Sequence, residues 1–146
     1  MPRKLMVSLV LVLQAGMAHA GQATTNSAEK GLVHADVLLK TRSAWDGSLY
    51  DAYPAGPPEL TLVKITIAPN TELPWHTHAA PNAAYVLSGE ITVEKRRDGA
   101  QKLLTKGDVL AELVGEPHRG VTGSSPVELL VFYAGAEGVP LSEPEQ

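Results

Sequence analysis

Short apolar or alternating segments, each bounded by turn-forming residues, recur along this chain from residue 36 to residue 135. Each segment has the length of a β-strand and is rich in Val, Ile, Leu, Thr or aromatic residues. No stretch of about a dozen residues keeps a helical period. The pattern therefore predicts an all-β domain, either a barrel or a sandwich of two sheets. The predicted strands are 36–41, 60–68, 83–89, 91–97, 101–106, 108–114 and 127–135.

Glycines are expected to set the turns between the central strands. Asp98 and Gly99 are typical of a two-residue type I′ hairpin, which needs positive φ at both central positions. Gly89 is expected to bend the chain between the two strands that flank it. The segment 42–58 contains three aromatic residues and has two interpretations, a packed surface loop or a lid over the mouth of a pocket.

The first twenty residues have the composition of a secretory signal peptide. Arg3 and Lys4 precede an apolar run at 5–13, and an Ala-His-Ala sequence ends at Ala20, where a signal peptidase requires small residues. The run is too short for a hydrocarbon core that needs about 20 apolar residues, and a short membrane anchor is the alternative. We expect cleavage after Ala20, no membrane span, and a periplasmic or secreted protein.

The rest of the chain is long enough for one hydrophobic core and too short for two. We expect a single globular domain at 36–137. Residues 21–35 precede it as a flexible arm, because a polar, small and aperiodic sequence cannot bury enough surface to offset its ordering entropy. Residues 138–146 follow the domain as a C-terminal tail.

The composition of the mature chain limits its chemistry. The chain has no cysteine, and its three methionines all lie in the predicted signal peptide. Thiol nucleophiles, disulfides and sulfur-ligated metal sites are therefore excluded, and any metal ion must bind nitrogen and oxygen. Cleavage would change the formal charge from −4 to −6, because the leader holds two basic residues and no acidic one. Nucleic acid is not expected as a partner, since the only basic cluster, 95–97, is typical of a solvated hairpin edge.

Four histidines remain after cleavage, and His76 and His78 stand two residues apart on a segment that reads as extended. Because residues i and i+2 of a strand point to the same face, both imidazoles can share one metal ion. A third ligand must come from another strand, and His118 follows the predicted strand 108–114, whereas His34 lies beside the arm. The spacing predicts a metal site of His76, His78 and His118. The alternative is that these three side chains only form hydrogen bonds within a pocket.

Residues 76–89 and 107–118 resemble the two sequence motifs of the cupin superfamily. The resemblance extends over about residues 58–135, with the two motifs in the expected order. The matching positions are His76, His78 and Gly89 in the first motif and Gly107, Asp108, Pro117 and His118 in the second.

This resemblance implies a small double-stranded β-helix of the jelly-roll type. It also implies one divalent metal ion (Fe, Mn, Zn, Ni or Cu) held inside the barrel by both motifs. Small cupins commonly pair through sheet faces, so we expect a homodimer by the same analogy.

One position departs from the family pattern. The first cupin motif usually carries a glutamate where this chain has Asn82. A neutral amide oxygen is a poor ligand for a first-row metal, and we expect Asn82 to hydrogen-bond a metal-bound water instead. Two acidic residues are alternatives for the lost carboxylate: Glu72, which shares strand parity with the histidine pair, and Glu116, two residues before His118.

Three neutral imidazoles would leave the charge of a divalent ion uncompensated, which favours polarising a carbonyl or binding an anionic substrate. The resemblance implies an oxygenase, isomerase, lyase or decarboxylase, and we expect a metal-dependent oxidoreductase, above all a dioxygenase, acting on a small oxygenated molecule. A non-catalytic module that binds a small molecule or a metal is the alternative.

The candidate catalytic groups are few. A metal-bound water and Asn82 are the first two. Tyr85 is a candidate, although its strand parity is opposite to that of His78 and Asn82, as expected of a packing residue. Arg119 is a further candidate because it could pair with a substrate carboxylate.

Overall fold

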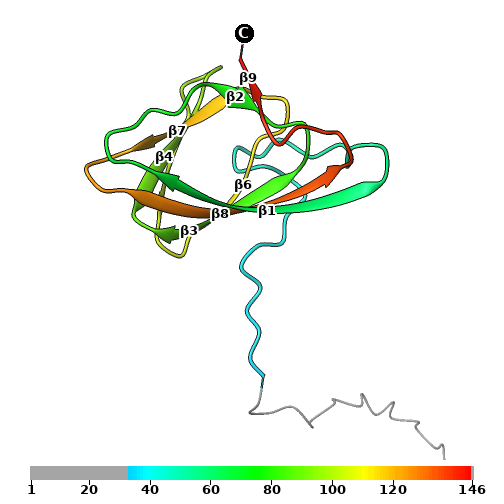
Figure 1. Ribbon diagram of the computed structural model, residues 1–146, viewed down its shortest axis with the longest axis horizontal. Helices are drawn as coiled ribbons and strands as arrows, with labels where there is room; N and C mark the ends of the chain where they lie inside the picture. Colours follow the sequence, from blue (N-terminus) through cyan, green and yellow to red (C-terminus); the bar gives the residue numbers. More distant parts are fainter. Residues whose placement is uncertain (1–32, 146) are drawn as a thin grey trace, which may run out of the picture. The chain divides into compact units, whose positions relative to one another are not determined.

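The computed structural model describes residues 33–145 of the chain (Figure 1). The predicted signal peptide and the predicted arm as far as residue 32 lie outside the described residues. Asp36–Gln146 cluster as one compact unit. No helix that could cross a membrane is found in the part of the chain that the structure describes. The strands are β1 (Pro58–Ile67), β2 (His76–Thr77), β3 (Asn82–Ser88), β4 (Glu90–Lys95), β5 (Gln101–Thr105), β6 (Val109–Ala111), β7 (His118–Thr122), β8 (Val127–Ala136) and β9 (Glu143–Pro144).

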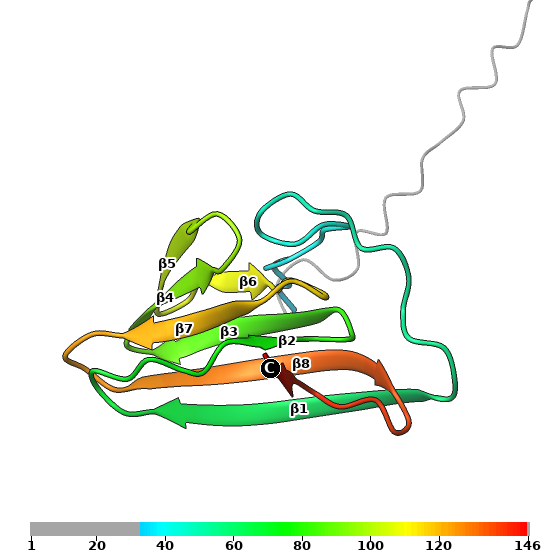
Figure 2. The same cartoon turned by 90° about the horizontal axis from the view of Figure 1, so that it is seen from above.

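Two antiparallel sheets face each other (Figures 1 and 2). The first sheet has the order β1-β8-β3-β6, and the second has the order β5-β4-β7-β2-β9. The chain passes from one sheet to the other at every connection except that between β4 and β5. This alternation defines the predicted all-β fold, a double-stranded β-helix of the jelly-roll type.

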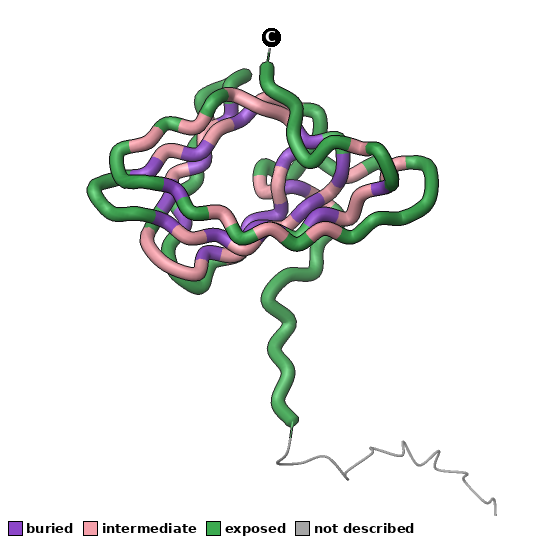
Figure 3. The backbone as a smooth tube through the Cα atoms, in the orientation of Figure 1, coloured by how far each residue is buried: buried purple, intermediate pink, exposed green. Residues whose placement is uncertain are grey.

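The core lies between the sheets, and buried residues are interspersed with half-buried and exposed ones along the strands of both sheets (Figure 3). Inward-facing positions alternate with exposed or half-buried ones along β3 and β4 because successive side chains of a strand point to opposite faces. The first sheet contributes Val86 and Val131 to the core, and the second contributes Ile91 and Leu104.

Gly89 makes the turn between β3 and β4, as the sequence predicts. Its φ is 77°, a left-handed conformation that glycine adopts without steric cost. A Cβ atom at this position would lie 2.3 Å from the carbonyl oxygen of Pro126. The turn therefore requires glycine for its conformation and for the close approach of the neighbouring backbone.

The loop between β4 and β5 differs from the predicted type I′ turn. It extends over residues 96–100, and of the pair Asp98 and Gly99 only the glycine has positive φ, at 69°. Asp98 keeps an ordinary φ because its carboxylate accepts a hydrogen bond from the backbone amide of Ala100 at 3.1 Å and pairs with Lys95. The prediction was wrong because a longer loop with one left-handed glycine satisfies these polar groups.

The strands also differ from the prediction in other places. Residues 36–41 form no strand and are exposed, and the predicted strand 108–114 is regular only over β6. β7 was not predicted, because its sequence HRGVT contains a central glycine and no apolar run. Gly115, with φ of 70°, turns the chain between these two strands.

The first part of the aromatic segment 42–58 packs on the barrel, which favours the packed-loop interpretation for residues 42–50. Ala44 is buried, and Tyr53 remains exposed. Three contacts anchor this loop: the amide of Trp45 donates to the carbonyl of Ala111 at 2.9 Å, Lys95 pairs with Asp46 at 2.8 Å, and the Tyr50 hydroxyl donates to the carbonyl of Glu112 at 2.6 Å.

Candidate metal centre

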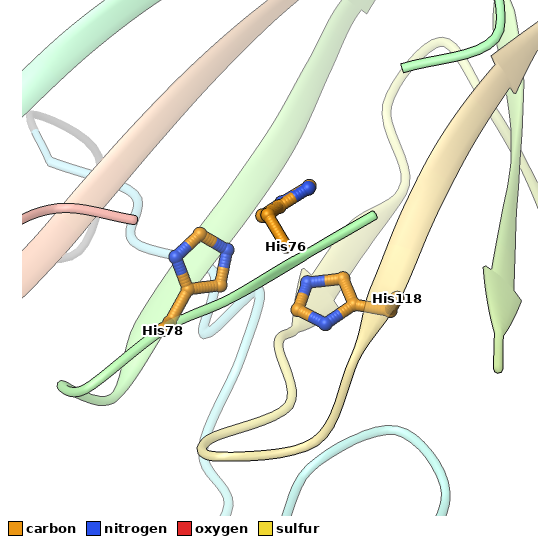
Figure 4. A group of neighbouring side chains, drawn as sticks. All are labelled: His76, His78 and His118. Carbon is orange, nitrogen blue, oxygen red and sulfur yellow. The ribbon is translucent and has the colours of Figure 1, made fainter. Parts of the chain in front are cut away.

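His76, His78 and His118 come together inside the second sheet, where their rings converge (Figure 4). β2 pairs with β7 through His76 and His118, so these two are cross-strand neighbours, and His78 follows on the same face. One candidate ligand atom of each ring lies within 4.8 Å of the other two. His78 and His118 are buried, and His76 is half-buried. The structure thus brings together all three histidines of the predicted site.

A backbone carbonyl orients each imidazole. Because a carbonyl can only accept, each Nδ1 carries a proton, and Nε2 has a free lone pair whenever the ring is neutral. Hydrogen bonding of the second ring nitrogen is the usual way in which proteins orient metal-ligating histidines. The Nδ1 to oxygen distances are 2.9 Å for His76 and Pro74, 2.6 Å for His78 and Leu141, and 2.8 Å for His118 and Glu116.

A carboxylate that the sequence analysis did not assign lies against these nitrogens. Glu112, between β6 and β7, places Oε2 at 3.0 Å from Nε2 of His118 and at 3.4 Å from Nε2 of His78. Adjacent ligands of a first-row ion with bonds of ~2.1 Å lie ~3.0–3.4 Å apart. These distances are compatible with ligands of one shared ion, and Glu112 places a carboxylate beside two of the three histidines.

The sequence held one signal for this residue. Glu112 is two residues from Leu110 in the predicted strand 108–114, so strand parity places it on the buried face. An acidic residue at a core-facing position needs a partner, and that rule alone would have nominated Glu112 beside Glu72 and Glu116.

The electrostatics of the group keep the carboxylate ionised. Burial alone would raise the pKa of Glu112, but hydrogen bonds from His118 and His78, with their charges, lower this pKa to about 2. Burial would likewise lower the pKa of His118, and the Glu112 carboxylate raises it above the usual value. Burial lowers the pKa of His76, so this ring is neutral at pH 7 and available as a ligand.

The two acidic alternatives lie in surface ion pairs instead of the histidine group. Glu72 accepts a hydrogen bond from Arg119 at 2.6 Å, and Glu116 pairs with Arg97 at 2.8 Å. Arg119 also donates to Glu94 at 2.9 Å. Arg119 thus links Glu72 and Glu94, and Glu116 forms a separate ion pair with Arg97.

Asn82 and Tyr85 also lie apart from the histidines. Asn82 is buried on β3, donates to the carbonyl of Ala80 at 3.3 Å, and leaves Oδ1 without a partner among the described residues. No hydrogen bond joins it to the histidines within residues 33–145. Tyr85 is half-buried on the opposite face of β3, as its parity predicts.

The four side chains border a cavity of about 70 Å³ inside the barrel. Its remaining wall is formed largely by aliphatic side chains of both sheets, and Tyr133 of β8 joins it beside His78, with ring centroids 5.7 Å apart. A small molecule beside the three histidines would therefore contact side chains of the barrel core.

The chain is similar to several solved structures. The polyketide cyclase RemF from Streptomyces resistomycificus is 25% identical, with a TM-score of 0.52, and the match covers 60% of this chain and 61% of that chain. The DMSP lyase DddQ from Ruegeria pomeroyi is also 25% identical, with a TM-score of 0.52, and the match covers 60% and 45%. A cupin-like protein from Thermotoga maritima is 16% identical, with a TM-score of 0.51 and coverage of 59% and 64%. Each match spans less than two thirds of the other protein.

The cupin domain family matches residues 63–133, a range that contains His76, His78, Glu112 and His118. No curated protein matches the chain. Together with the double-stranded β-helix and its structural relatives, the family match shows that the chain belongs to the cupin superfamily.

Proposed function

We propose that this protein is a metal-dependent enzyme whose divalent ion is bound by His76, His78, His118 and Glu112. The observation that carries the proposal is the pair of contacts from Glu112 Oε2 to Nε2 of His118 and of His78, at 3.0 and 3.4 Å. The Nδ1 protons are held by backbone carbonyls, so each Nε2 faces inward and can bind a cation. Without a metal ion, the Nε2 proton of His118 pairs with the carboxylate, and we propose that a divalent ion takes the place of that proton.

The donor set fits a first-row metal. Imidazole nitrogen with one carboxylate oxygen suits iron, manganese, zinc, nickel or copper. The carboxylate partly compensates the charge of the ion, which three imidazoles alone would leave at its full value. A bound ion would supply Lewis-acid chemistry toward a substrate oxygen.

The surrounding residues favour chemistry on a small oxygenated molecule. The burial of His78 and His118 limits access of water, which strengthens electrostatic interactions at the site. We infer a dioxygenase reaction if the resident metal is redox-active and an isomerase or lyase reaction if it is not. The names of RemF, a cyclase, and DddQ, a lyase, support catalysis on this fold without assigning a substrate.

The first test is the metal content of protein purified without a metal-affinity resin. We expect about one equivalent in the wild type, almost none in His78→Ala, and a 10-fold to 100-fold or greater loss of affinity in Glu112→Gln. Glu128→Gln makes the same chemical change on β8, where Glu128 pairs with Lys64, and serves as the matched control. A metal-free wild type that stays empty after reconstitution would overturn the proposal.

The second test separates turnover from binding alone. Oxygen uptake and product formation are measured with the reconstituted protein, with and without a chelator. Turnover that the chelator abolishes supports the enzyme. Ligand binding that survives the chelator without turnover would instead establish a non-catalytic binding module.

We also propose that the protein is exported to the periplasm or secreted. The basic Arg3 and Lys4, the apolar run 5–13 and the small residues before Gly21 support this proposal. Mass spectrometry of extracytoplasmic fractions should find a mature chain beginning at Gly21. A full-length chain confined to the cytoplasm would contradict it.

We further propose a homodimer that forms through the outer face of the first sheet. Leu60, Leu62 and Phe132 are 70%, 61% and 41% exposed there, and Leu62 pairs directly with Phe132 between β1 and β8. Exposed apolar patches of this kind mark interaction surfaces. Light scattering should show a dimer that Leu62→Arg dissociates, whereas Leu103→Arg, at a similarly exposed position on β5, leaves the dimer intact. A monomeric wild type would refute the dimer.

A further inference from the structure

The cavity beside the metal-binding group has walls of two contrasting kinds. The polar end holds the three histidines and Glu112, and most of the remaining wall is aliphatic. Both sheets contribute to the aliphatic part, so a ligand bound at the polar end must place the rest of its surface against hydrocarbon. The aliphatic wall includes Ile65, Ile67, Leu129 and Val131 from the first sheet and Ile91 and Leu104 from the second.

The basic side chains nearest to this cavity already have acidic partners. Arg119 borders the cavity, but its guanidinium bonds Glu72 and Glu94 and lies 4.6 Å from the ring centroid of Trp75. Lys95, which pairs with His118 across the sheet, is bound to Asp46 and Asp98 at 2.8 and 3.1 Å. A second charged group on a ligand would therefore be buried without a partner, which is strongly unfavourable.

Among the described residues, Tyr133 is the one polar residue of the wall besides the histidines, Glu112 and Arg119. Its hydroxyl makes no hydrogen bond inside the described chain, although the residue is almost fully buried. The hydroxyl is not among the fully buried polar atoms that lack a partner, so it is accessible, and a ligand oxygen beside His78 could accept a hydrogen bond from it.

The size of the cavity limits the ligand. One water molecule needs about 10–15 Å³ of volume on this scale, so a cavity of about 70 Å³ has room for about five non-hydrogen atoms. Pockets for drug-sized ligands are several times larger, from about 300 Å³.

We propose that the ligand of this centre is a short aliphatic molecule with a single polar head group. Its oxygen-bearing head group, a carboxylate or carbonyl, lies at the histidine and Glu112 end and accepts a hydrogen bond from Tyr133. Its chain of a few carbons packs against the aliphatic wall. The proposal rests on the metal centre proposed above, and it excludes dicarboxylates, phosphate esters and sugars as good ligands.

The test uses straight-chain carboxylates as probes of the Co²⁺-loaded protein, followed by the visible absorption of the ion and by calorimetry. We expect affinity to rise about fourfold for each added methylene from acetate to about butyrate. Affinity should fall again for hexanoate and octanoate, which exceed the cavity. Succinate has the length of butyrate and a second charge, and it should bind at least tenfold more weakly.

Variants on β8 separate the two parts of the cavity. Leu129→Ala should move the optimum to longer acids, and Tyr133→Phe should weaken all acids by about threefold to tenfold without changing the order of chain lengths. Leu130→Ala, the neighbouring position on the outer face of β8, is the matched control and should leave the profile unchanged. Cobalt content is measured in every sample.

The outcomes distinguish this inference from the proposal on which it rests. If succinate binds as tightly as butyrate, or if affinity is independent of chain length, in protein with a full equivalent of cobalt, the ligand class is wrong and the metal centre stands. If cobalt does not bind, both proposals are contradicted.

Discussion

The two sheets of the barrel differ in how much backbone pairing supports them. In the first sheet, β1 and β8 pair over ten residues. In the second, β2 is two residues long and pairs with β7 at one position and with β9 at two. Yet β2 carries His76 and leads directly to His78. The candidate ligands therefore depend on the least extensively paired part of the fold.

The C-terminal segment compensates for the short pairing of β2. β9 pairs with both residues of β2, the carbonyl of Leu141 holds the ring of His78, and the amide of Glu145 donates to the carbonyl of Trp75 at 2.9 Å. The first sheet therefore holds the more extensive backbone pairing, whereas residues 139–145 help to set the geometry of the histidine group. Changes in the first sheet should mainly lower the free energy of unfolding, and changes in residues 139–145 should mainly lower metal affinity.

The largest effect on stability is expected from Leu110→Ala in the first sheet. Leu110 is almost fully buried on β6, and the lost contacts and the cavity left behind should cost about 2–5 kcal/mol of the free energy of unfolding. Urea denaturation of the metal-free protein measures this change. The folded variant should still bind one equivalent of metal, and loss of metal at full folding would break the proposed division between the sheets.

Removal of residues 139–146 should lower metal affinity more than it lowers the stability of the metal-free protein. Without the Leu141 carbonyl and β9, His78 loses its orienting hydrogen bond, and metal affinity should fall about 10-fold to 100-fold. Competition with a fluorescent chelator measures the affinity, and removal of Gln146 alone is the control. If truncation lowers the stability of the metal-free protein as much as Leu110→Ala and leaves metal affinity unchanged, the segment is only structural.

Loss of the ion pair between Lys95 and Asp46 should lower the free energy of unfolding by less than Leu110→Ala does, and by an amount that depends on pH. Although burial would raise the pKa of Asp46, hydrogen bonds from Lys95 and Ser48 lower it from 3.8 to about 2. A carboxyl group whose pKa is lower in the folded state stabilises the fold above its unfolded pKa, and the contribution is lost as pH falls toward the folded value. Asp46→Asn should therefore destabilise at neutral pH, with a difference from wild type that shrinks between about pH 4 and pH 2. A difference that is constant over this range in urea denaturation would contradict the assignment.

The smallest effect is expected from Glu72→Gln. Glu72 is largely exposed, and Arg119 keeps Glu94 as a second partner. The loss in the free energy of unfolding should be below about 1 kcal/mol, and metal content should not change. A loss of metal as large as that in Glu112→Gln would show that Glu72 is a metal ligand.

Local patterns in the sequence account for much of the fold and for part of the site. The period of two along a strand places His76 and His78 on one face, and Gly89 marks a turn that only glycine fits. The two motifs indicate that His118 joins the pair. These features are readable because each depends on a few neighbouring residues or on a spacing shared with a family.

Most of the strands, the histidine pair and the absence of a glutamate at position 82 can be read from the sequence, because they follow from residue type and from local backbone geometry. Only the tertiary structure decided that Glu112, not Glu72 or Glu116, lies against the histidine nitrogens, and that Leu141 orients His78. Both contacts join segments whose separation is set by sheet register and by the turn at Gly115. Such long-range distances depend on how all strands pack at once, so no short stretch of sequence encodes them.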